Sequence, residues 1–179
     1  MNRRTSPWLL LALAACAGKP APRTPPLPVP PPHPPAPAFQ VENGAVVLPL
    51  PVEFSAGRAV PTEASDEALR HVVAFLAAKP AITLLRVEAH TNGADAAAEQ
   101  TLSEGRAMAV CLRLVEMGAD EARLLPVGFG NTKPRADGST PAGRAQNVRI
   151  EFRPAAMNGK PIGGMPVDGG GKVAGTAAK

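Results

Sequence analysis

The sequence predicts an α+β fold, a two-layer sandwich in which helices pack on a mixed β-sheet. Patterns typical of strands and helices alternate along the chain in the order β-α-β-α-β-β. All of them fall within residues 40–155, between ends that are rich in proline and glycine. Because strand–helix–strand connections are almost always right-handed, we expect both crossover helices on one face of the sheet.

The first strand region is predicted to be a broken strand or a pair of strands, and the first helix is predicted to be regular. Apolar, β-prone residues occupy positions 46–48 and 52–54, but two prolines between them cannot donate hydrogen bonds to a neighbouring strand. A helix is expected at residues 62–78, and Pro80 ends it. Its apolar face, spaced i, i+3, i+4 and i+7, consists of Leu69, Val72, Val73 and Leu76.

A second strand and a second helix follow. Residues 82–89 alternate between apolar and charged side chains, which predicts a strand with its charged side turned away from the core. Residues 97–117 are expected to be helical, with Gly118 as the C-cap. The inward positions of this helix are Leu102, Val110, Leu114 and Met117.

Two short strands complete the pattern. Residues 124–127 are apolar and precede the turn Gly128-Phe129-Gly130. Residues 148–152 alternate again, with Arg149 and Glu151 between apolar neighbours. The sheet is therefore expected to end with this strand, and the domain at residue 155.

The N-terminus has the features of a lipoprotein signal peptide. Basic residues precede an apolar run at positions 8–15, which is too short to span about 30 Å of hydrocarbon. Leu13-Ala14-Ala15-Cys16 then matches a lipobox, whose cysteine accepts diacylglycerol. We expect a signal peptide at residues 1–15 and fatty acyl chains, palmitate among them, on Cys16. The alternative is an ordinary signal peptide with an incidental cysteine.

The two ends of the mature chain are expected to lie outside the fold. Residues 16–39 are mostly proline and alanine, so they predict a polyproline tether rather than a helix or strand. Residues 156–179 are rich in glycine and alanine and predict a disordered tail. Ala17, directly after the lipobox cysteine, favours sorting to the outer membrane.

The charge distribution argues against nucleic acid as a partner. The chain has a net charge of +4, but residues 40–155 hold fourteen acidic and twelve basic side chains. The basic surplus therefore lies in the tails, and no aromatic platform for stacked bases is present. Cys111 has no cysteine or histidine nearby in metal-ligand spacing, so no metal site and no cofactor are expected.

Four motifs in order carry a resemblance to a known family. They are Glu88-Ala89-His90-Thr91-Asn92-Gly93, Leu102-Ser103-Glu104-Gly105-Arg106-Ala107, Gly128-Phe129-Gly130-Asn131, and Asn147-Val148-Arg149-Ile150-Glu151-Phe152. Together they make the chain resemble the OmpA-like C-terminal domain, the periplasmic module of outer-membrane porins, Pal-type lipoproteins and flagellar stator proteins. The resemblance implies noncovalent binding of peptidoglycan and no enzymatic activity.

The resemblance also implies a set of site residues: Thr91, Asn92, Leu102, Arg106 and Arg149. In the family, an aspartate of the loop and an arginine of the helix hold diaminopimelate, a zwitterionic amino acid of the peptidoglycan stem peptide. Arg106 stands at the arginine position, and a guanidinium suits a carboxylate because it donates two parallel hydrogen bonds.

The aspartate position holds Asn92, which provides no charge. Asp95 or Glu99 is a candidate for the missing carboxylate. Two functions therefore remain open. The chain is expected either to bind peptidoglycan and tether the outer membrane to the cell wall, or to keep the fold as a scaffold that binds a protein partner in the envelope.

Overall fold

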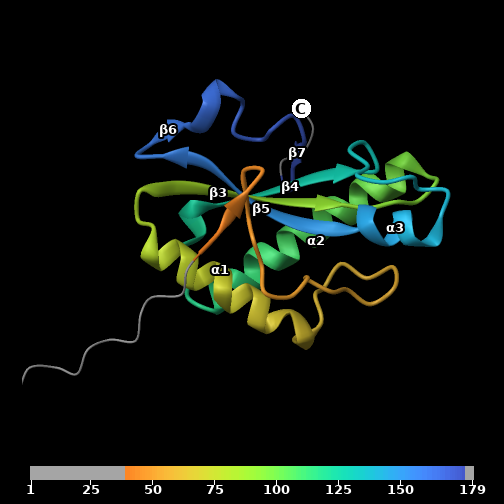
Figure 1. Cartoon of the computed structure of the whole chain (residues 1–179), viewed down its shortest axis with the longest axis horizontal. Coiled ribbons are helices and arrows are strands. Elements are labelled where there is room, and N and C mark those ends of the chain that lie inside the picture. Colours follow the sequence, from red (N-terminus) through yellow and green to blue (C-terminus); the bar gives the residue numbers. More distant parts are fainter. Residues whose placement is uncertain (1–38, 176–179) are drawn as a thin grey trace, which may run out of the picture. The chain divides into compact units, whose positions relative to one another are not determined.

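A computed structural model of the chain describes residues 39–175 (Figure 1). The expected signal peptide, the acylated Cys16 and the tether up to residue 38 lie outside the described residues. Within residues 39–175, no helix is both long enough and apolar enough to cross a membrane.

The centre of the fold is a mixed five-stranded sheet. Its middle strand β3 (Ile82–His90) runs parallel to β4 (Leu124–Gly130) and antiparallel to β5 (Arg149–Met157). Two short strands, β6 (Lys160–Pro161) and β7 (Lys172–Val173), complete the order β6-β5-β3-β4-β7. Parallel strands need a crossover connection, and the helix between β3 and β4 provides it.

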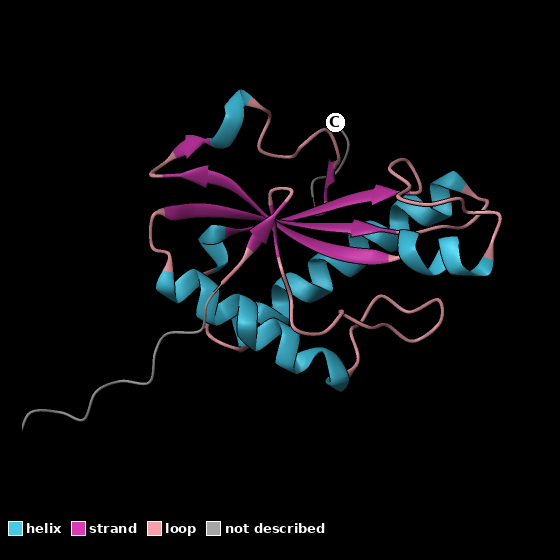
Figure 2. Cartoon of the chain, viewed as in Figure 1, coloured by secondary structure: helices cyan, strands magenta, loops and turns pink. Residues whose placement is uncertain are grey.

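Helices α1 (Asp66–Ala78) and α2 (Ala96–Glu116) cover one face of this sheet (Figure 2). A 3₁₀ turn, η1 (Glu63–Ser65), precedes α1, and a second, η2 (Glu121–Arg123), precedes β4. The two-layer α+β architecture predicted from the sequence is confirmed. The predicted inward positions Leu69, Val72, Leu76, Val110 and Leu114 are buried, whereas Val73, Leu102 and Met117 are only partly buried.

The first strand differs from the prediction. Instead of a strand at residues 46–54, a small hairpin of β1 (Val41–Glu42) and β2 (Ala45–Val46) forms separately from the main sheet. Residues Asn43 and Gly44 have the positive φ angles of 50° and 77° that a tight hairpin turn requires. Beyond it, Phe54 makes only a single bridge, to Pro61. The prolines at positions 49 and 51 explain why no longer strand forms.

The prediction of a disordered tail from residue 156 is wrong up to residue 175. β5 continues to Met157, and β6, the 3₁₀ turn η3 (Ile162–Gly164) and β7 follow it across the sheet face opposite α1 and α2 (Figure 1). Val127 and Phe129 are at most 1% exposed as a result. A Cβ atom on Gly171 would lie 2.8 Å from the Phe129 ring, so a glycine is needed for this close contact. Because glycine has no side chain, this packing leaves no apolar periodicity in the sequence from which it could be predicted.

A third helix, α3 (Pro141–Asn147), precedes β5 and was not predicted. Thr140 caps it by accepting a hydrogen bond from the Gly143 amide at 3.0 Å, and Pro141 occupies the first position of the helix. This Thr-Pro start is a favourable helix N-terminus. The helix is too short to show an apolar period in the sequence.

Candidate functional site

The predicted site residues other than Arg149 lie in the loop after β3 and on α2. Thr91 and Asn92 directly follow β3, and Leu102 and Arg106 lie on α2. Thr91 is 3% exposed; its amide donates to the Gly130 carbonyl at 2.9 Å and its hydroxyl to the Glu99 carbonyl at 3.3 Å. These bonds fix the loop against both β4 and α2.

Arg106 is nearly buried, and only one nitrogen of its guanidinium group makes a hydrogen bond with residues 39–175. It is 6% exposed, and its Nε donates to the Arg58 carbonyl at 3.0 Å. Its guanidinium carbon lies 4.6 Å from the centre of the Phe54 ring, a cation–π distance. Neither terminal nitrogen of Arg106 makes a hydrogen bond with residues 39–175. The fork of the guanidinium is thus positioned but without a partner of its own in this part of the chain.

Burial and a neighbouring charge act on Arg106 in opposite directions. Loss of hydration lowers the pKa of Arg106, and the attraction of Glu99 works against this shift. Glu99 and Arg106 are seven residues apart on α2, so they lie on the same side of the helix, two turns apart. The site therefore contains a carboxylate close enough to interact with the arginine.

Of the two candidates for the missing carboxylate, Asp95 is already hydrogen-bonded at the start of α2. Its side chain is the N-cap of α2 and accepts from the Ala97 and Ala98 amides at 3.0 and 3.1 Å. The Glu99 carboxylate instead packs against Gly93, where a Cβ atom would collide with it. Gly93 directly follows Asn92, so Glu99 places its charge beside the position where the family has its aspartate.

Asn92 has a structural role in this arrangement. Its side-chain oxygen accepts a hydrogen bond of 2.8 Å from Asn147, which is 1% exposed. Asn147 also accepts from the Arg135 and Ala136 amides and donates to the Ala136 carbonyl. Asn147 therefore joins the loop after β3 to the loop before α3. It is a positioning residue that the sequence motif contained but that was not singled out.

The structure does not bring Arg149 to this site. On β5, Arg149 pairs directly with His90 of β3, and both lie on the sheet face opposite α2. Its Nε donates to Glu151 at 2.5 Å, and its terminal nitrogens donate to the carbonyls of Asn147 and Lys133. Strand alternation explains this placement: the neighbours Ile150 and Phe152 face the helices, so Arg149 cannot.

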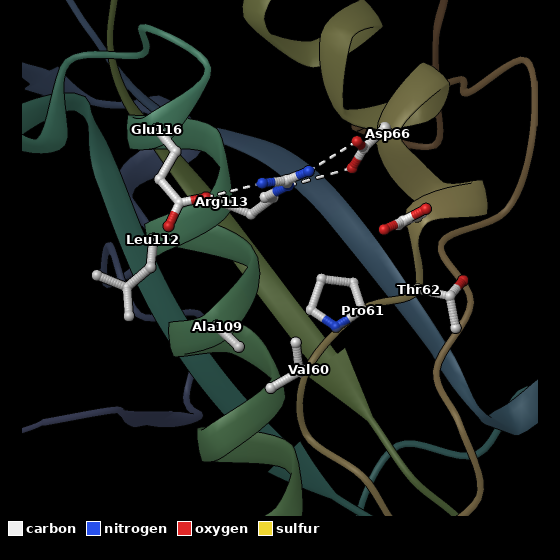
Figure 3. A pocket seen from close by; sticks show the side chains of 9 residues that line it. Val60, Pro61, Thr62, Asp66, Ala109, Leu112, Arg113 and Glu116 are labelled. Carbon is white, nitrogen blue, oxygen red and sulfur yellow. Dashed lines mark hydrogen bonds and ion pairs between the residues drawn. The ribbon is translucent and has the colours of Figure 1, made fainter.

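A cavity beside α2 is lined by residues other than the predicted ones (Figure 3). It has a volume of about 460 Å³ and is formed between the start of α1, the segment before it and the outer side of α2. Arg113 crosses it and bonds both oxygens of Asp66, at 3.1 and 2.7 Å, and also Glu116. Three of the charged residues that line the cavity are thus paired with one another, and none of the predicted site residues lines it.

The site residues missed by sequence reasoning are those that hold Arg106. Phe54 and Arg58 belong to the irregular segment before α1, and they contact Arg106 from about fifty positions away in the sequence. The proline-interrupted pattern gave no signal for this contact. Gly93 stood inside the recognised motif, and its close contact with Glu99 appears only in the structure.

Comparison with known proteins gives consistent matches. The family model described as "OmpA family" matches residues 53–148. Outer membrane porin F of Pseudomonas fluorescens is 40% identical over 118 residues, and the outer-membrane lipoprotein YfiB of Pseudomonas aeruginosa is 41% identical over 70 residues. These matches cover 65% and 38% of this chain but only 34% and 42% of the porin and of YfiB. The chain thus spans well under half of either relative.

A solved structure shows the same fold. The peptidoglycan-associated lipoprotein of Burkholderia pseudomallei superposes with a TM-score of 0.52 at 24% identity, covering 57% of this chain and 86% of that one. At this identity the likeness concerns the fold. None of these three relatives is named as an enzyme.

Proposed function

The chain belongs to the OmpA family, and from this premise we propose that it binds peptidoglycan noncovalently through diaminopimelate of the stem peptide. Its relatives include an outer-membrane lipoprotein and a lipoprotein named for its association with peptidoglycan, which supports the proposal. The proposed site consists of Thr91, Asn92, Leu102 and Arg106, with Glu99 added and Arg149 removed.

The placement of Arg106 is the observation that carries the proposal. A zwitterionic ligand needs a cation for its carboxylate and an anion for its ammonium group. Arg106 offers a guanidinium fork that is positioned by Phe54 and Arg58 and makes no other bond with the described residues through its terminal nitrogens. Glu99, beside Gly93, offers the anion. Both ends of the ligand therefore have a complementary partner despite the asparagine at position 92.

We further propose that Cys16 anchors the protein in the outer membrane through its acyl chains, as the lipobox predicts. Several acyl chains on one residue give stable anchoring, whereas a single chain is marginal. About twenty proline-rich residues would then reach on the order of 60 Å from the membrane as a semi-rigid spacer. The protein would thereby link the outer membrane to the cell wall.

Co-sedimentation with purified sacculi tests this function. The parent protein should sediment with sacculi, and Arg106→Ala should weaken binding about tenfold or more, because a charge-assisted hydrogen bond to the ligand is lost. Arg70→Ala, which removes an exposed arginine from α1, is the matched control and should bind as the parent does. If the parent does not sediment, the peptidoglycan proposal is wrong, and the scaffold function with an envelope protein partner takes its place.

A further inference from the structure

The sheet face opposite α1 and α2 carries charged side chains in direct register. Three residues of β3 lie opposite three residues of β5, each pair side by side across the strands. We call these six residues the outer-face cluster: Arg86, Glu88, His90, Arg149, Glu151 and Arg153. Glu88, His90 and Glu151 are at most 6% exposed, an unusual degree of burial for ionisable groups on the outer face of a sheet.

The C-terminal segment forms a roof over this cluster. Arg86 donates from Nη1 to the Val167 carbonyl at 2.8 Å, and Lys133 donates to the Gly169 carbonyl at 2.9 Å. A cavity of about 390 Å³ remains beneath the segment. It is lined by the outer-face cluster together with Lys133, Arg135 and Met165 among others.

The cavity carries more positive than negative charge. Five of its lining residues are arginines or lysines and two are glutamates, which leaves a surplus of three positive charges before His90 is counted. A surplus of one sign in a recessed site concentrates ions of the opposite sign. The lining therefore favours an anion.

The two glutamates do not oppose an anion, because arginines already neutralise them. Glu151 accepts from Arg149 at 2.5 Å and from Arg153 at 2.6 Å. Burial alone would raise the pKa of Glu151, but these hydrogen bonds outweigh it and lower the pKa to about 2. Glu88 accepts in the same way from Arg86 at 2.5 Å. The glutamates thus act as supports that hold the arginine side chains around the cavity.

His90 is an independent observation that favours a polar ligand in this cavity. It is 2% exposed and lines the cavity, and neither of its ring nitrogens makes a hydrogen bond with residues 39–175. Its Nε2 lies 3.5 Å from a carboxylate oxygen of Glu88 and 3.9 Å from one of Glu151, and arginines already donate to both of these glutamates. Its ring is instead held by stacking on Phe129, with 5.1 Å between the ring centres. A buried donor without an acceptor costs free energy, so such a group needs an explanation. An acceptor atom of a bound anion would supply one.

A metal ion is the competing occupant, since one ligand atom each from Glu88, His90 and Glu151 lie within 4.8 Å of one another. The charge of the surroundings decides against it. A cation would have to displace arginines from both carboxylates and would meet the surplus positive charge of the lining.

We propose that this cavity is a binding site for a phosphate monoester or an equivalent phosphate dianion. A phosphate monoester carries about −1.5 to −2 charges at pH 7 and three acceptor oxygens, which suits donors that converge from several directions. The site lies on the opposite face from Arg106, so it goes beyond peptidoglycan binding and does not depend on it. Free phosphate and the headgroup of an anionic lipid share this chemistry. Met165, which lines the cavity and is 58% exposed, would be in reach of an acyl chain.

Isothermal titration calorimetry on the full-length protein tests the site. The probes are inorganic phosphate and dihexanoyl phosphatidic acid, a soluble lipid that ends in a phosphate monoester. Dihexanoyl phosphatidylcholine is the control because its phosphate is a diester capped by choline. We expect at least one of the two probes to bind and the control lipid not to bind; which probe binds more tightly identifies the source.

Two variants link the binding to the cavity. Lys133 and Arg135 are exposed at its rim. Because Lys133 also donates to the Gly169 carbonyl and Arg135 pairs with Glu151 at 3.1 Å, the thermal melt of each variant is compared with that of the parent to check that the fold is kept. Lys133→Ala and Arg135→Ala should each weaken binding about tenfold, while Arg70→Ala on the other face should not change it. The proposal is overturned if neither probe binds, if both variants bind as the parent does, or if Zn²⁺ binds to the cluster and phosphate does not.

Discussion

In the proposed site, the positions of the Glu99 and Arg106 side chains depend on close contacts with single neighbouring residues. Glu99 can reach the position beside Asn92 only because residue 93 has no Cβ atom, and Arg106 keeps its orientation only while Phe54 and Arg58 hold it. In the proposed site, Glu99 takes the role that the aspartate has in the family, because it brings a carboxylate from α2 to Gly93, next to Asn92. The local charge is preserved although the motif is not.

The proposed role of Glu99 can be tested by removing its charge and then placing a carboxylate at position 92. Glu99→Gln should weaken binding to sacculi about tenfold, because the ligand's ammonium group loses its anion. Adding Asn92→Asp to that variant should restore most of the affinity. Aspartate has the same shape as asparagine, so its carboxylate can still accept the hydrogen bond from Asn147. Asn92→Asp alone should change affinity little. Binding assays on the three variants check this, and a Glu99→Gln protein that binds like the parent would refute the role of Glu99.

The sequence motifs gave four residues of the proposed site, and their role in binding stays a prediction. Thr91 and Asn92 lie in the loop after β3, and Leu102 and Arg106 lie four residues apart on α2. Arg149 was assigned by the same resemblance, but strand alternation places it on the other side of the sheet. The choice between Asp95 and Glu99 needed coordinates, because it depends on a helix cap and on a close contact with a glycine.

Among the elements, α2 contributes both to the proposed site and to the core. Its first half carries the proposed site, and its second half packs into the core through Val110 and Leu114, both fully buried. Ser103 of the same helix donates to the Gln100 carbonyl and accepts from the Gly130 amide at 2.9 Å. The helix therefore cannot shift against β4 without breaking contacts in both the core and the site.

Removal of one core side chain of α2 tests this packing. Leu114→Ala should lower the free energy of unfolding by about 2–5 kcal/mol, because the truncation leaves a cavity under the helix. Leu112→Ala is the matched control: Leu112 is 55% exposed, and its loss should change stability by about 0.5 kcal/mol or less. Chemical denaturation measures both variants. Equal stabilities would mean that the two faces of α2 have been assigned wrongly.

The elements that the sequence failed to predict share a physical cause. The β1–β2 hairpin, α3 and the C-terminal segment are all short or rich in proline and glycine, so they carry no apolar period of their own. Their positions are determined by what they cover: the C-terminal segment buries Val127 and Phe129, and Arg86 bonds its Val167 carbonyl. Long amphipathic elements such as α1 and α2 were predictable to within a few residues.

The whole molecule presents two different faces. One face of the sheet is covered by α1 and α2, with the proposed peptidoglycan site at the start of α2; the other carries the outer-face cluster under the C-terminal segment. A protein built in this way could bind the cell wall with one face and an anion with the other. Both faces would be held near the membrane by the proposed anchor at Cys16.

The anchor makes a prediction for the whole chain. Cys16→Ala removes the acyl acceptor, so the protein should remain unprocessed and should disappear from the outer-membrane lipoprotein fraction. Cys111→Ala is the control, because Cys111 is buried in the fold, and burial raises the pKa of its thiol to about 12. Membrane fractionation and mass spectrometry of the N-terminal peptide measure the outcome. A Cys16→Ala protein that is processed and fractionates like the parent would exclude lipid anchoring.

The most direct measurement for the central proposal changes the ligand by one carboxylate. Lysine differs from diaminopimelate only by lacking one carboxylate, so two otherwise identical stem peptides isolate the group that Arg106 should hold. Calorimetric titration should show that the parent binds the diaminopimelate peptide about tenfold or more tightly than the lysine peptide, and that Arg106→Ala binds both equally weakly. Equal affinities in the parent, or a preference that survives in Arg106→Ala, would contradict peptidoglycan recognition through Arg106.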